Sequence, residues 1–392
     1  MKYALFVSLL ICASTSFAGG SAPGETPVVP SGLAFGFYRE VAKKPGNVFV
    51  SPYSLASALT MASAGARGAT LAELRSTLGL TDSPHEAESD LRAALVGEGE
   101  GRPVLEVANH LWARTGQEYE PDFLILTQKY YGAGFSAIDF ARNPERARAE
   151  INDWAAAETH HKIQNLIPPG AFGPKTELVL TNAVYFRGRW RDPFNKIDTF
   201  DQPFHPEKDA AVDRAFMHRL SRVDYWANAS FQAVRLPYEG GDFAMTIVLP
   251  RDGTKLAQLT PELLGHIRGH LRLQRVRLSI PKFHIEYGTE ASGALERLGL
   301  KTAFTRAADF SGIRRPTRDD PLYLTKAFQR TYLDVYEKGT EAAAATALIA
   351  EMGASRLAME SIPPFDANHP FFFSIENVRT GTVLFEGRLA KP

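Results

Sequence analysis

Two pairs of histidines carry the side chains best suited to bind a metal ion. His266 and His270 are four positions apart and would share one face of a helix, a spacing that suits two zinc ligands. No His-Glu-x-x-His pattern and no nearby cluster of carboxylates accompanies them, and Gly269 weakens the helix they need. The adjacent His160 and His161 would point in different directions on a helix. We therefore predict that these histidines lie on the surface, and that the chain holds no metal ion and no cofactor.

Hydrolytic chemistry is the next possibility that the side chains raise. The sequence contains ten histidines, but none lies in a recognisable catalytic signature, and no Gly-x-Ser-x-Gly elbow is present. Catalytic triads are assembled in space from distant segments, so a missing motif lowers the case for a hydrolase without closing it. We predict that the chain is not an enzyme and keep a hydrolase as the alternative.

The densest basic stretch contains four arginines and could bind a polyanion: Arg268, Arg272, Arg275 and Arg277. Residues 275–280 alternate between polar and apolar side chains, which is typical of a strand with one solvated face. Over the whole chain, 44 basic residues balance 44 acidic residues, so no overall field attracts nucleic acid or an anionic membrane. We predict a half-buried strand here, and neither a nucleic acid nor a membrane as partner.

The first eighteen residues have the pattern of an export signal. Lys2 supplies a positive start, residues 4–13 are apolar, and residues 16–18 end like a small-x-small cleavage site. The apolar run is too short for a stable membrane anchor. We predict cleavage near Ala18 and a secreted or periplasmic protein. Cys12 is the only cysteine and leaves with this segment, and a mature chain without cysteine favours a bacterial protein.

Helix start signals dominate the first half of the chain. Residues 19–30 are rich in Gly and Pro and have the composition of a disordered leader. Caps or capping boxes then predict helices that begin near Ser31, Ser51-Pro52, residues 70–73, residues 83–86 and Asn143-Pro144.

Strand patterns dominate the second half, from Glu177 onward. Runs rich in Val, Ile, Phe and Tyr, separated by turn residues, predict strands at 177–187, 214–226, 230–237, 242–249, 275–287, 371–376 and 382–388. Helices followed by strands are typical of an α+β fold. We find no linker and no internal repeat, so we predict one large domain over residues 31–392.

One alanine-rich tract fits neither pattern. Residues 337–346 read locally as a helix because Ala is the best helix former. The tract is small rather than amphipathic, however, and residues 353–364 have no period of either kind. An aperiodic segment of that length inside a compact domain indicates function or disorder. Side chains this small would let a segment slide between two strands with little steric resistance.

The sequence resembles the serpin family in five segments, which occur in the family's order and at matching spacing. These segments are Asn47–Leu55, Thr181–Trp190, Ala308–Ile313, Glu337–Thr346 and Phe365–Phe371. The resemblance implies a single domain with three β-sheets, eight or nine helices and an exposed reactive loop at about 338–364. It also implies an inhibitor, not an enzyme, whose partner is a target protease, most often of the serine type. The expected chain is a monomer with a risk of polymerisation.

The family's mechanism assigns a role to the alanine tract. A protease attacks a bond in the loop and forms an acyl-enzyme, and the cut loop then enters the central sheet as an extra strand. The hinge of that loop would be Glu337, Lys338, Gly339, Thr340, Glu341, Ala342, Ala343, Ala344, Ala345 and Thr346. Thr340, Ala342, Ala344 and Thr346 would face the helical layer beneath the sheet. Small residues at these positions favour an inhibitor over a non-inhibitory binding protein or chaperone of the same fold, which stays the alternative.

Other positions are carried over from the resemblance one by one. Ser51, Ser54 and Asn182 match the region where the sheet opens, and Gln329 stands there in place of the family's common His. Gln can donate and accept hydrogen bonds, so the network can survive without the pH sensitivity of a His. Trp190, Lys282 and Glu337 match the top of the sheet, where the family pairs a Lys with the hinge Glu beside a Trp.

The cleaved bond has several candidates. Counting from Glu337 gives Gly353–Ala354, whereas counting back from residues 361–364 gives Glu360–Ser361. We favour Gly353–Ala354, because the length that inserts sets how far the protease is carried. Arg356–Leu357 would suit a trypsin-like enzyme and Met352–Gly353 a chymotrypsin- or elastase-like one. A cysteine protease also remains open as the target.

Overall fold

A computed structural model gives the fold and describes residues 31–96, 103–132, 134–315, 317, 320–340 and 362–392. The predicted signal peptide at 1–18 and leader at 19–30 lie outside these residues, as do residues 341–361 of the predicted loop. The described chain folds as an α+β structure, as the sequence predicts. No helix in it has the length and hydropathy that a membrane crossing needs.

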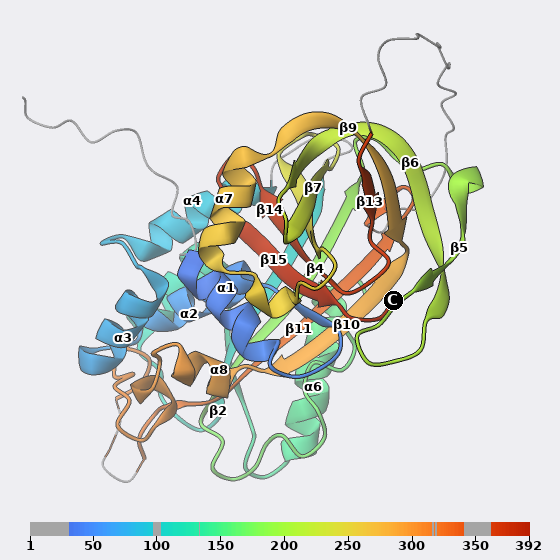
Figure 1. The fold of residues 1–392 in the computed structure, drawn as a ribbon. Coiled ribbons are helices and arrows are strands. Elements are labelled where there is room, and N and C mark those ends of the chain that lie inside the picture. Colours follow the sequence, from blue (N-terminus) through green and yellow to red (C-terminus); the bar gives the residue numbers. More distant parts are fainter. Residues whose placement is uncertain (1–30, 97–102, 133, 316, 318–319, 341–361) are drawn as a thin grey trace, which may run out of the picture.

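Eight α-helices are present in the described residues, and most of them gather on one side of the molecule (Figure 1). Their bounds are α1 Ser31–Val41, α2 Pro52–Ser63, α3 Gly68–Leu78, α4 Pro84–Val96, α5 Pro121–Tyr131, α6 Pro144–Glu158, α7 Pro261–His270 and α8 Ser292–Arg297. Helix α2 is buried along its whole length, and the Ser51 side chain caps it by accepting from the Ser54 amide. Asn143 caps α6 in the same way.

A six-stranded sheet contains the strands that flank the alanine tract. Its order is β10-β11-β12-β4-β2-β3. The bounds are β10 Phe283–Glu290, β11 Leu324–Tyr336, β12 Gly339–Thr340, β4 Leu178–Arg189, β2 Val104–Arg114 and β3 Phe135–Ile138. Helix α6 packs on its outer face, where Ile151 and Ala155 meet Val179, Ala183 and Phe328.

A second sheet of nine strands follows the order β1-β15-β14-β8-β7-β6-β9-β13, with β5 paired to β6. The bounds are β1 Val48–Val50, β5 Thr199–Phe204, β6 Val212–Ala227, β7 Phe231–Pro237, β8 Phe243–Pro250, β9 Arg272–Pro281, β13 Pro364–Asp366, β14 Phe371–Asn377 and β15 Val383–Leu389. The expected three sheets join into two hydrogen-bonded networks because β6 is continuous. Its first half pairs with β5, its last residues pair with β7, and β9 runs along both parts.

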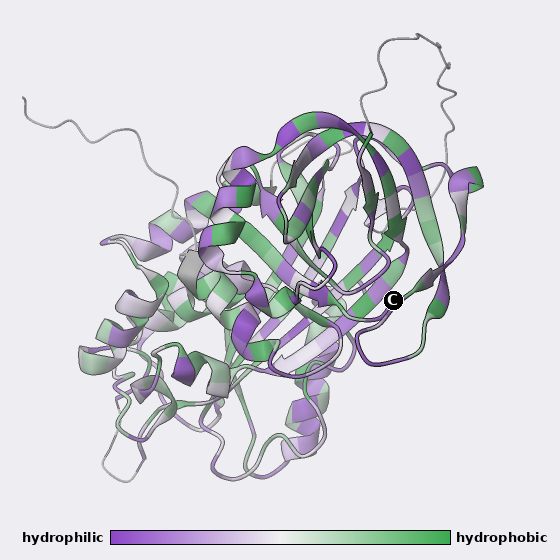
Figure 2. Cartoon of the chain, viewed as in Figure 1, coloured by the Kyte–Doolittle hydropathy of each residue, from purple (hydrophilic) through white to green (hydrophobic). Residues whose placement is uncertain are grey.

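The main hydrophobic core lies between the nine-stranded sheet, the inner face of the six-stranded sheet and the helices α1 and α2. The buried strands of both sheets are correspondingly apolar along much of their length (Figure 2). A smaller core fills the space between the six-stranded sheet and α6. The six-stranded sheet is therefore covered on both faces, so a strand that enters it enters a packed interior.

Two local predictions are corrected by the structure. The predicted strand 275–287 is two strands, because the chain turns at Lys282 and passes from the nine-stranded sheet at β9 to the six-stranded sheet at β10. The predicted helix start at Thr70 is also wrong, because α3 begins at Gly68 and Thr70 lies inside it. The Thr70 hydroxyl accepts from the Asp309 amide instead, and Glu73 accepts from the Thr302 amide.

Candidate functional site

The candidate site is the point where the alanine tract begins, between β11 and β4. Strand β12 is only Gly339–Thr340, and it pairs antiparallel with β11 through Val335–Thr340 and with β4 through Thr340–Gly188. Beyond β12, strands β11 and β4 pair directly with each other and run parallel, from Leu324–Leu178 to Tyr332–Tyr185. The first two residues of the tract that form a strand thus already occupy the gap between these strands. The local helix interpretation is wrong at these two positions.

Gly339 is required at the entry to this gap. Its φ of +148° lies in a region that side chains rarely adopt, and a Cβ there would lie 2.1 Å from the Gly188 carbonyl oxygen. The backbones of β12 and β4 approach as closely as they do because no side chain separates them. Gly188 is also needed, since a Cβ on it would lie 2.8 Å from the Tyr238 ring.

The three residues predicted at the top of the sheet lie together. Lys282 Nζ donates to Glu337 Oε1 at 3.2 Å, and the Trp190 indole donates to the Tyr336 carbonyl at 3.0 Å. The Trp190 amide donates to the Lys338 carbonyl, so this residue holds the chain on both sides of Glu337. Burial acts to raise the pKa of Glu337, but hydrogen bonds from its own backbone amide and from Lys282 lower the pKa below its ordinary value.

Thr340 points inward, toward the nine-stranded sheet. Its hydroxyl lies 2.9 Å from the Tyr238 hydroxyl, and both residues are fully buried. The Tyr238 ring stacks on Trp190 with 4.5 Å between ring centroids. The inward position is the one expected for Thr340. However, the layer beneath it here is the nine-stranded sheet and not the helices, which lie further along the strand at Ser51 and Ser54.

The residues predicted for the sheet-opening region form one buried network below β12. Gln329 Nε2 donates to the Ser51 carbonyl at 2.8 Å and to Asn182 Oδ1 at 2.7 Å, and Gln329 Oε1 accepts from the Ser51 amide. Asn182 Nδ2 donates to Ser54 Oγ and to Asn109 Oδ1. The network therefore joins the start of α2 to β11, β4 and β2. The structure shows this contact; the role of the network in sheet opening stays a prediction.

Asn109 is a member of the network that the sequence reasoning missed. It lies on β2, directly opposite Asn182 in the register of β2 and β4. The available signal was the alternation of residues 104–114, in which Leu105, Val107 and Leu111 recur at even spacing on the same face as Asn109.

The structure describes the chain up to Thr340 and again from Ile362 onward. Strand β13 then pairs parallel with β9, from Pro364–Arg277 to Asp366–Ser279. The predicted bond Gly353–Ala354, its alternatives Met352, Arg356 and Leu357, and the hinge positions from Glu341 to Thr346 all lie outside the described residues. The structure therefore shows where the chain is held on each side of residues 341–361, at β12 and at β13.

The other side chains considered for chemistry are surface or packing groups. His266 and His270 stack on α7 with 3.9 Å between ring centroids, and His270 Nδ1 bonds to the His266 carbonyl. No cluster of three or more metal-ligating side chains occurs among the described residues. Arg268 turns inward from α7 and pairs with the buried Glu376 at 2.8 Å. Arg272, Arg275 and Arg277 lie exposed on β9, as the strand prediction requires.

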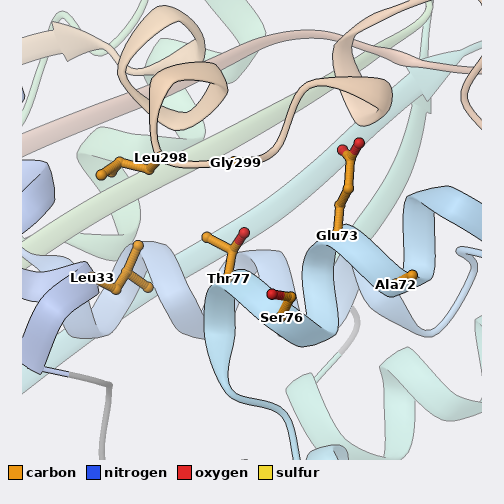
Figure 3. A pocket seen from close by; sticks show the side chains of 7 residues that line it. All are labelled: Leu33, Ala72, Glu73, Ser76, Thr77, Leu298 and Gly299. Carbon is orange, nitrogen blue, oxygen red and sulfur yellow. The ribbon is translucent and has the colours of Figure 1, made fainter.

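A cavity of about 480 Å³ lies between α1, α3 and the segment after α8 (Figure 3). Glu73 is the one ionisable residue among those lining it: Leu33, Ala72, Glu73, Ser76, Thr77, Leu298 and Gly299. The Glu73 carboxylate is engaged by the amide and the hydroxyl of Thr302. The one carboxylate that lines this cavity is therefore already engaged by Thr302.

Comparison with known proteins agrees with this fold. The sequence model of the family described as Serpin (serine protease inhibitor) matches residues 30–392, and the chain belongs to this family. A serpin-like protein of Thermococcus kodakarensis is 35% identical over 94% of this chain and 86% of its own length. The leukocyte elastase inhibitor of Bos taurus is 36% identical over 88% of this chain and 93% of its own length.

A solved structure supports the same assignment. Serpin48 of the insect Tenebrio molitor has a TM-score of 0.82 and 30% identity, and the match covers 95% of this chain and all of that one. Serpins are generally protease inhibitors and not catalytic enzymes, which agrees with the absence of a catalytic signature from the sequence.

Proposed function

We propose that this chain inhibits serine proteases as a suicide substrate, through insertion of its cut reactive loop into the six-stranded sheet. The observation that carries the proposal is the position of β12. It lies between two parallel strands and runs antiparallel to both. A chain that continues beyond Thr340 in the same direction would separate β11 from β4 and pair with each of them.

The reaction follows from the chemistry of acyl transfer. The protease serine attacks a loop carbonyl carbon, the peptide C–N bond breaks, and the new amine leaves with a proton from the protease. The loop segment that begins at Glu337 then carries the protease as an ester. Water would normally hydrolyse this ester, but insertion of the cut segment carries the protease along the sheet and distorts its active site. Inhibition therefore depends on a race between insertion and hydrolysis.

Insertion is downhill because it exchanges one strand interface for two. The direct pairing of β11 with β4 is parallel, and a parallel ladder is slightly less stable per residue than an antiparallel one. A strand that continues β12 would replace it with two antiparallel ladders. The small side chains from Ala342 to Ala345 support this step, since a large or charged side chain on the inner face would meet a packed core.

The contacts at the entry support a role in controlling insertion. The pair Lys282–Glu337 and the indole of Trp190 hold the start of β12, and the network of Ser51, Ser54, Asn182 and Gln329 ties β11 and β4 to α2. We propose that these contacts keep the sheet closed below β12 until the loop is cut. Each buried hydrogen bond in such a network contributes about 1 kcal/mol, so the barrier is adjustable by single substitutions.

The remaining proposals concern the export, the domain bounds and the oligomeric state of the chain. Residues 1–18 would direct export and be removed near Ala18, residues 19–30 would form a leader, and residues 31–392 would form the inhibitory domain. The working protein would be a monomer. A sheet that can accept its own loop can also accept the loop of another copy, which is the source of the polymerisation risk.

The test mixes the mature protein with trypsin-like, chymotrypsin-like and elastase-like serine proteases and with a papain-like cysteine protease. An SDS-stable complex with a serine protease is the expected result. The first residue of the released C-terminal peptide then identifies the cut bond among Gly353–Ala354, Arg356–Leu357 and Met352–Gly353. A chain that is nicked while every protease stays active would support a non-inhibitory binding protein. A stable complex with the cysteine protease alone would replace the serine class.

A further inference from the structure

The outer face of the β6–β9 pair presents arginines and large apolar side chains together. We define the β6–β9 face by Leu220 and Arg222 on β6 and by Leu273, Arg275 and Arg277 on β9. All five side chains are exposed, and Leu220 and Leu273 are 51% and 57% accessible. Arg222 lies directly opposite Arg275, and Leu220 lies directly opposite Arg277, so the five side chains share one side of the sheet.

The arginines of this face have no partner in the described parts of the chain. Arg222, Arg275 and Arg277 make no side-chain hydrogen bond or ion pair there, although like charges directly opposite each other destabilise a sheet. Asp224 and Asp366 lie in register near these arginines. Asp224 is two positions from Arg222 on the same face, whereas Asp366 is bound by Gln202 and Asn368. Within the described residues, the face therefore holds three guanidinium groups whose donors are free for an external acceptor.

The apolar side chains continue beyond β6 and β9. Phe200 on β5 is 56% exposed and stacks on His218 of β6, and Ile197, just before β5, is 83% exposed. Strands β5, β6 and β9 lie together on the side of the molecule that also carries β13 (Figure 1). Most of the exposed large hydrophobic residues in the described chain fall here: Ile197, Phe200, Leu220 and Leu273, against Leu124, Ile125 and Val378 elsewhere. Such a grouping marks an interaction surface.

The position of this face relates it to the reactive loop. Arg277 pairs in register with Pro364, the first residue of β13, and residue 353 is connected to Pro364 by a segment that spans at most about 40 Å when fully extended. A protease bound to any of the candidate bonds is thus held within about its own diameter of the β6–β9 face. Both proteins then remain close enough for a second contact outside the loop.

We propose that the β6–β9 face is a docking surface for the target protease, and that it recognises a protease surface on which carboxylates alternate with apolar groups. This proposal rests on the proposed function. Arg and large apolar residues together are the composition of a protein interface, whereas a polyanion site needs basic residues alone. A second copy of this chain is a poorer occupant, because a two-fold contact would place the arginines of one copy against those of the other.

The experiment compares the triple variant R222A/R275A/R277A with the matched control R142A/R146A/R306A. The control removes the same charge from exposed arginines that also make no side-chain contact in the described chain. The readout is the second-order rate constant for SDS-stable complex formation with the fastest protease of the panel. We expect the first variant to react about tenfold more slowly than wild type at low ionic strength, with the difference largely lost near about 0.5 M salt. The control should match wild type.

The amount of complex formed per molecule should stay the same in both variants, because the loop and the sheet are unchanged. A second variant, L220S/L273S, should also slow the reaction, but with little dependence on salt. Equal rates for the arginine variant and its control would overturn the docking surface while leaving the proposed function intact. No complex with the wild-type chain would overturn both. A variant that loses binding to immobilised heparin but keeps its rate with the protease would assign the face to a polyanion instead.

Discussion

Lys282 and Glu337 form an ion pair where the two sheets meet the start of the alanine tract. Lys282 Nζ lies 3.1 Å from Glu337 Oε2, and the Glu337 side chain is only 4% exposed. The Glu337 carbonyl also accepts from the Phe194 amide, so both the side chain and the backbone of this residue are held. The pair joins the segment between β9 and β10 to the segment between β11 and β12, and it thereby holds the residue just before the start of β12.

We predict that Glu337→Lys loosens the top of the sheet and promotes polymerisation. The substitution places two ammonium groups against each other in a partly buried site, where a charge left without its partner costs about 3 kcal/mol or more. The expected result is loss of monomer and growth of a ladder of oligomers on mild heating, measured by native electrophoresis and size-exclusion chromatography. A variant that stays monomeric after heating would show that this pair does not hold the sheet.

Two further variants separate charge from packing at this site. Glu337→Gln keeps the shape and should fall between wild type and Glu337→Lys. The exchange E337K/K282E restores an ion pair and should recover part of the monomer. Since the pKa of Glu337 is lowered in the folded state, the stability from this group is present above the unfolded pKa and is lost as the pH falls through the folded pKa. Heating at a pH below the lowered pKa of Glu337 should therefore reproduce the effect of Glu337→Gln.

Gly339→Ala should displace β12 from between β11 and β4. A Cβ at this position would meet the Gly188 carbonyl at 2.1 Å, and the φ of +148° adds strain of about 1–3 kcal/mol. We expect a lower unfolding midpoint and a larger share of cleaved but non-inhibiting product with protease. Gly241→Ala is the control, because Gly241 has a φ of +78° but nothing within 4 Å of its Cβ position. Comparable losses in both variants would mean that backbone strain, and not the close approach of the strands, is the cause.

The sequence predicted the strands of the nine-stranded sheet better than those of the six-stranded sheet. Strands β7, β8, β14 and β15 lie within a residue or two of their predicted ranges, because each buries an apolar run that periodicity detects. Strand β11 was missed. It contains Gln329 and Thr331, which are polar yet buried, and their partners Ser51 and Phe49 lie far away in the chain. A window of neighbouring residues cannot reveal a polar group that is satisfied by a distant segment.

The candidate site is likewise predictable only in part from the local sequence. The contacts of Ser51, Ser54, Asn182, Trp190, Lys282 and Glu337 were anticipated through the resemblance to the serpins, whereas spacing alone gave only the cap at Ser51. The strand at Gly339–Thr340 could not be predicted locally, because the helix propensity of the alanines that follow opposes it. It forms because Tyr336 and Arg189 place two backbones beside it.

The alternation expected beyond β12 can be tested with two neighbouring alanines. Thr340 is buried against Tyr238, and the period of two in a strand places Ala344 on the same side and Ala345 on the opposite side after insertion. Ala344→Arg should therefore reduce the SDS-stable complex about tenfold or more, because a charge enters a packed core, and the chain should be cleaved as a substrate. Ala345→Arg should be the milder of the two variants, because the outer face of the sheet at this level is covered by α6 and not by the main core. Equal loss in the two variants would argue against insertion as a regular strand.

Gln329→His should introduce a pH dependence at the buried network that joins Gln329 to Ser51 and Asn182. Gln329 is neutral at every pH and makes hydrogen bonds to Ser51 and Asn182, whereas a buried His is held neutral and must bind a proton at low pH. The unfolding free energy of the variant, relative to wild type, should fall as the pH drops through about 6.5. The loss is about 1.4 kcal/mol for each unit by which the pKa of the introduced His is lower in the folded chain than in the unfolded chain. Denaturation midpoints at pH 5.5 and 7.5 measure the difference. An unchanged difference between the two proteins would show that the position is hydrated or open.

Glu386 should make the folded chain less stable as the pH rises from weakly acidic to neutral. It lies on β15 with 1% exposure, Oε2 has no hydrogen-bond partner in the described residues, and burial raises its pKa to about 8, against the lowering effect of Arg268. The unfolded chain loses this proton near pH 4.5, so stability from the protonated group falls between pH 4.5 and about 8 and is constant above. Burial likewise raises the pKa of Glu88 to about 7, with the same sign.

The variant Glu386→Gln isolates this contribution, because Gln keeps the shape and does not ionise. Between pH 5 and pH 8 its unfolding free energy should fall less than that of wild type, with a difference on the order of a few kcal/mol. The loss of stability that is due to Glu88 should remain in the variant. Glu150→Gln, an exposed exchange on α6, is the matched control and should follow wild type at each pH. Parallel profiles for wild type and Glu386→Gln would mean that the Glu386 carboxyl ionises normally in the fold, and that a cation such as Arg268 compensates for its burial.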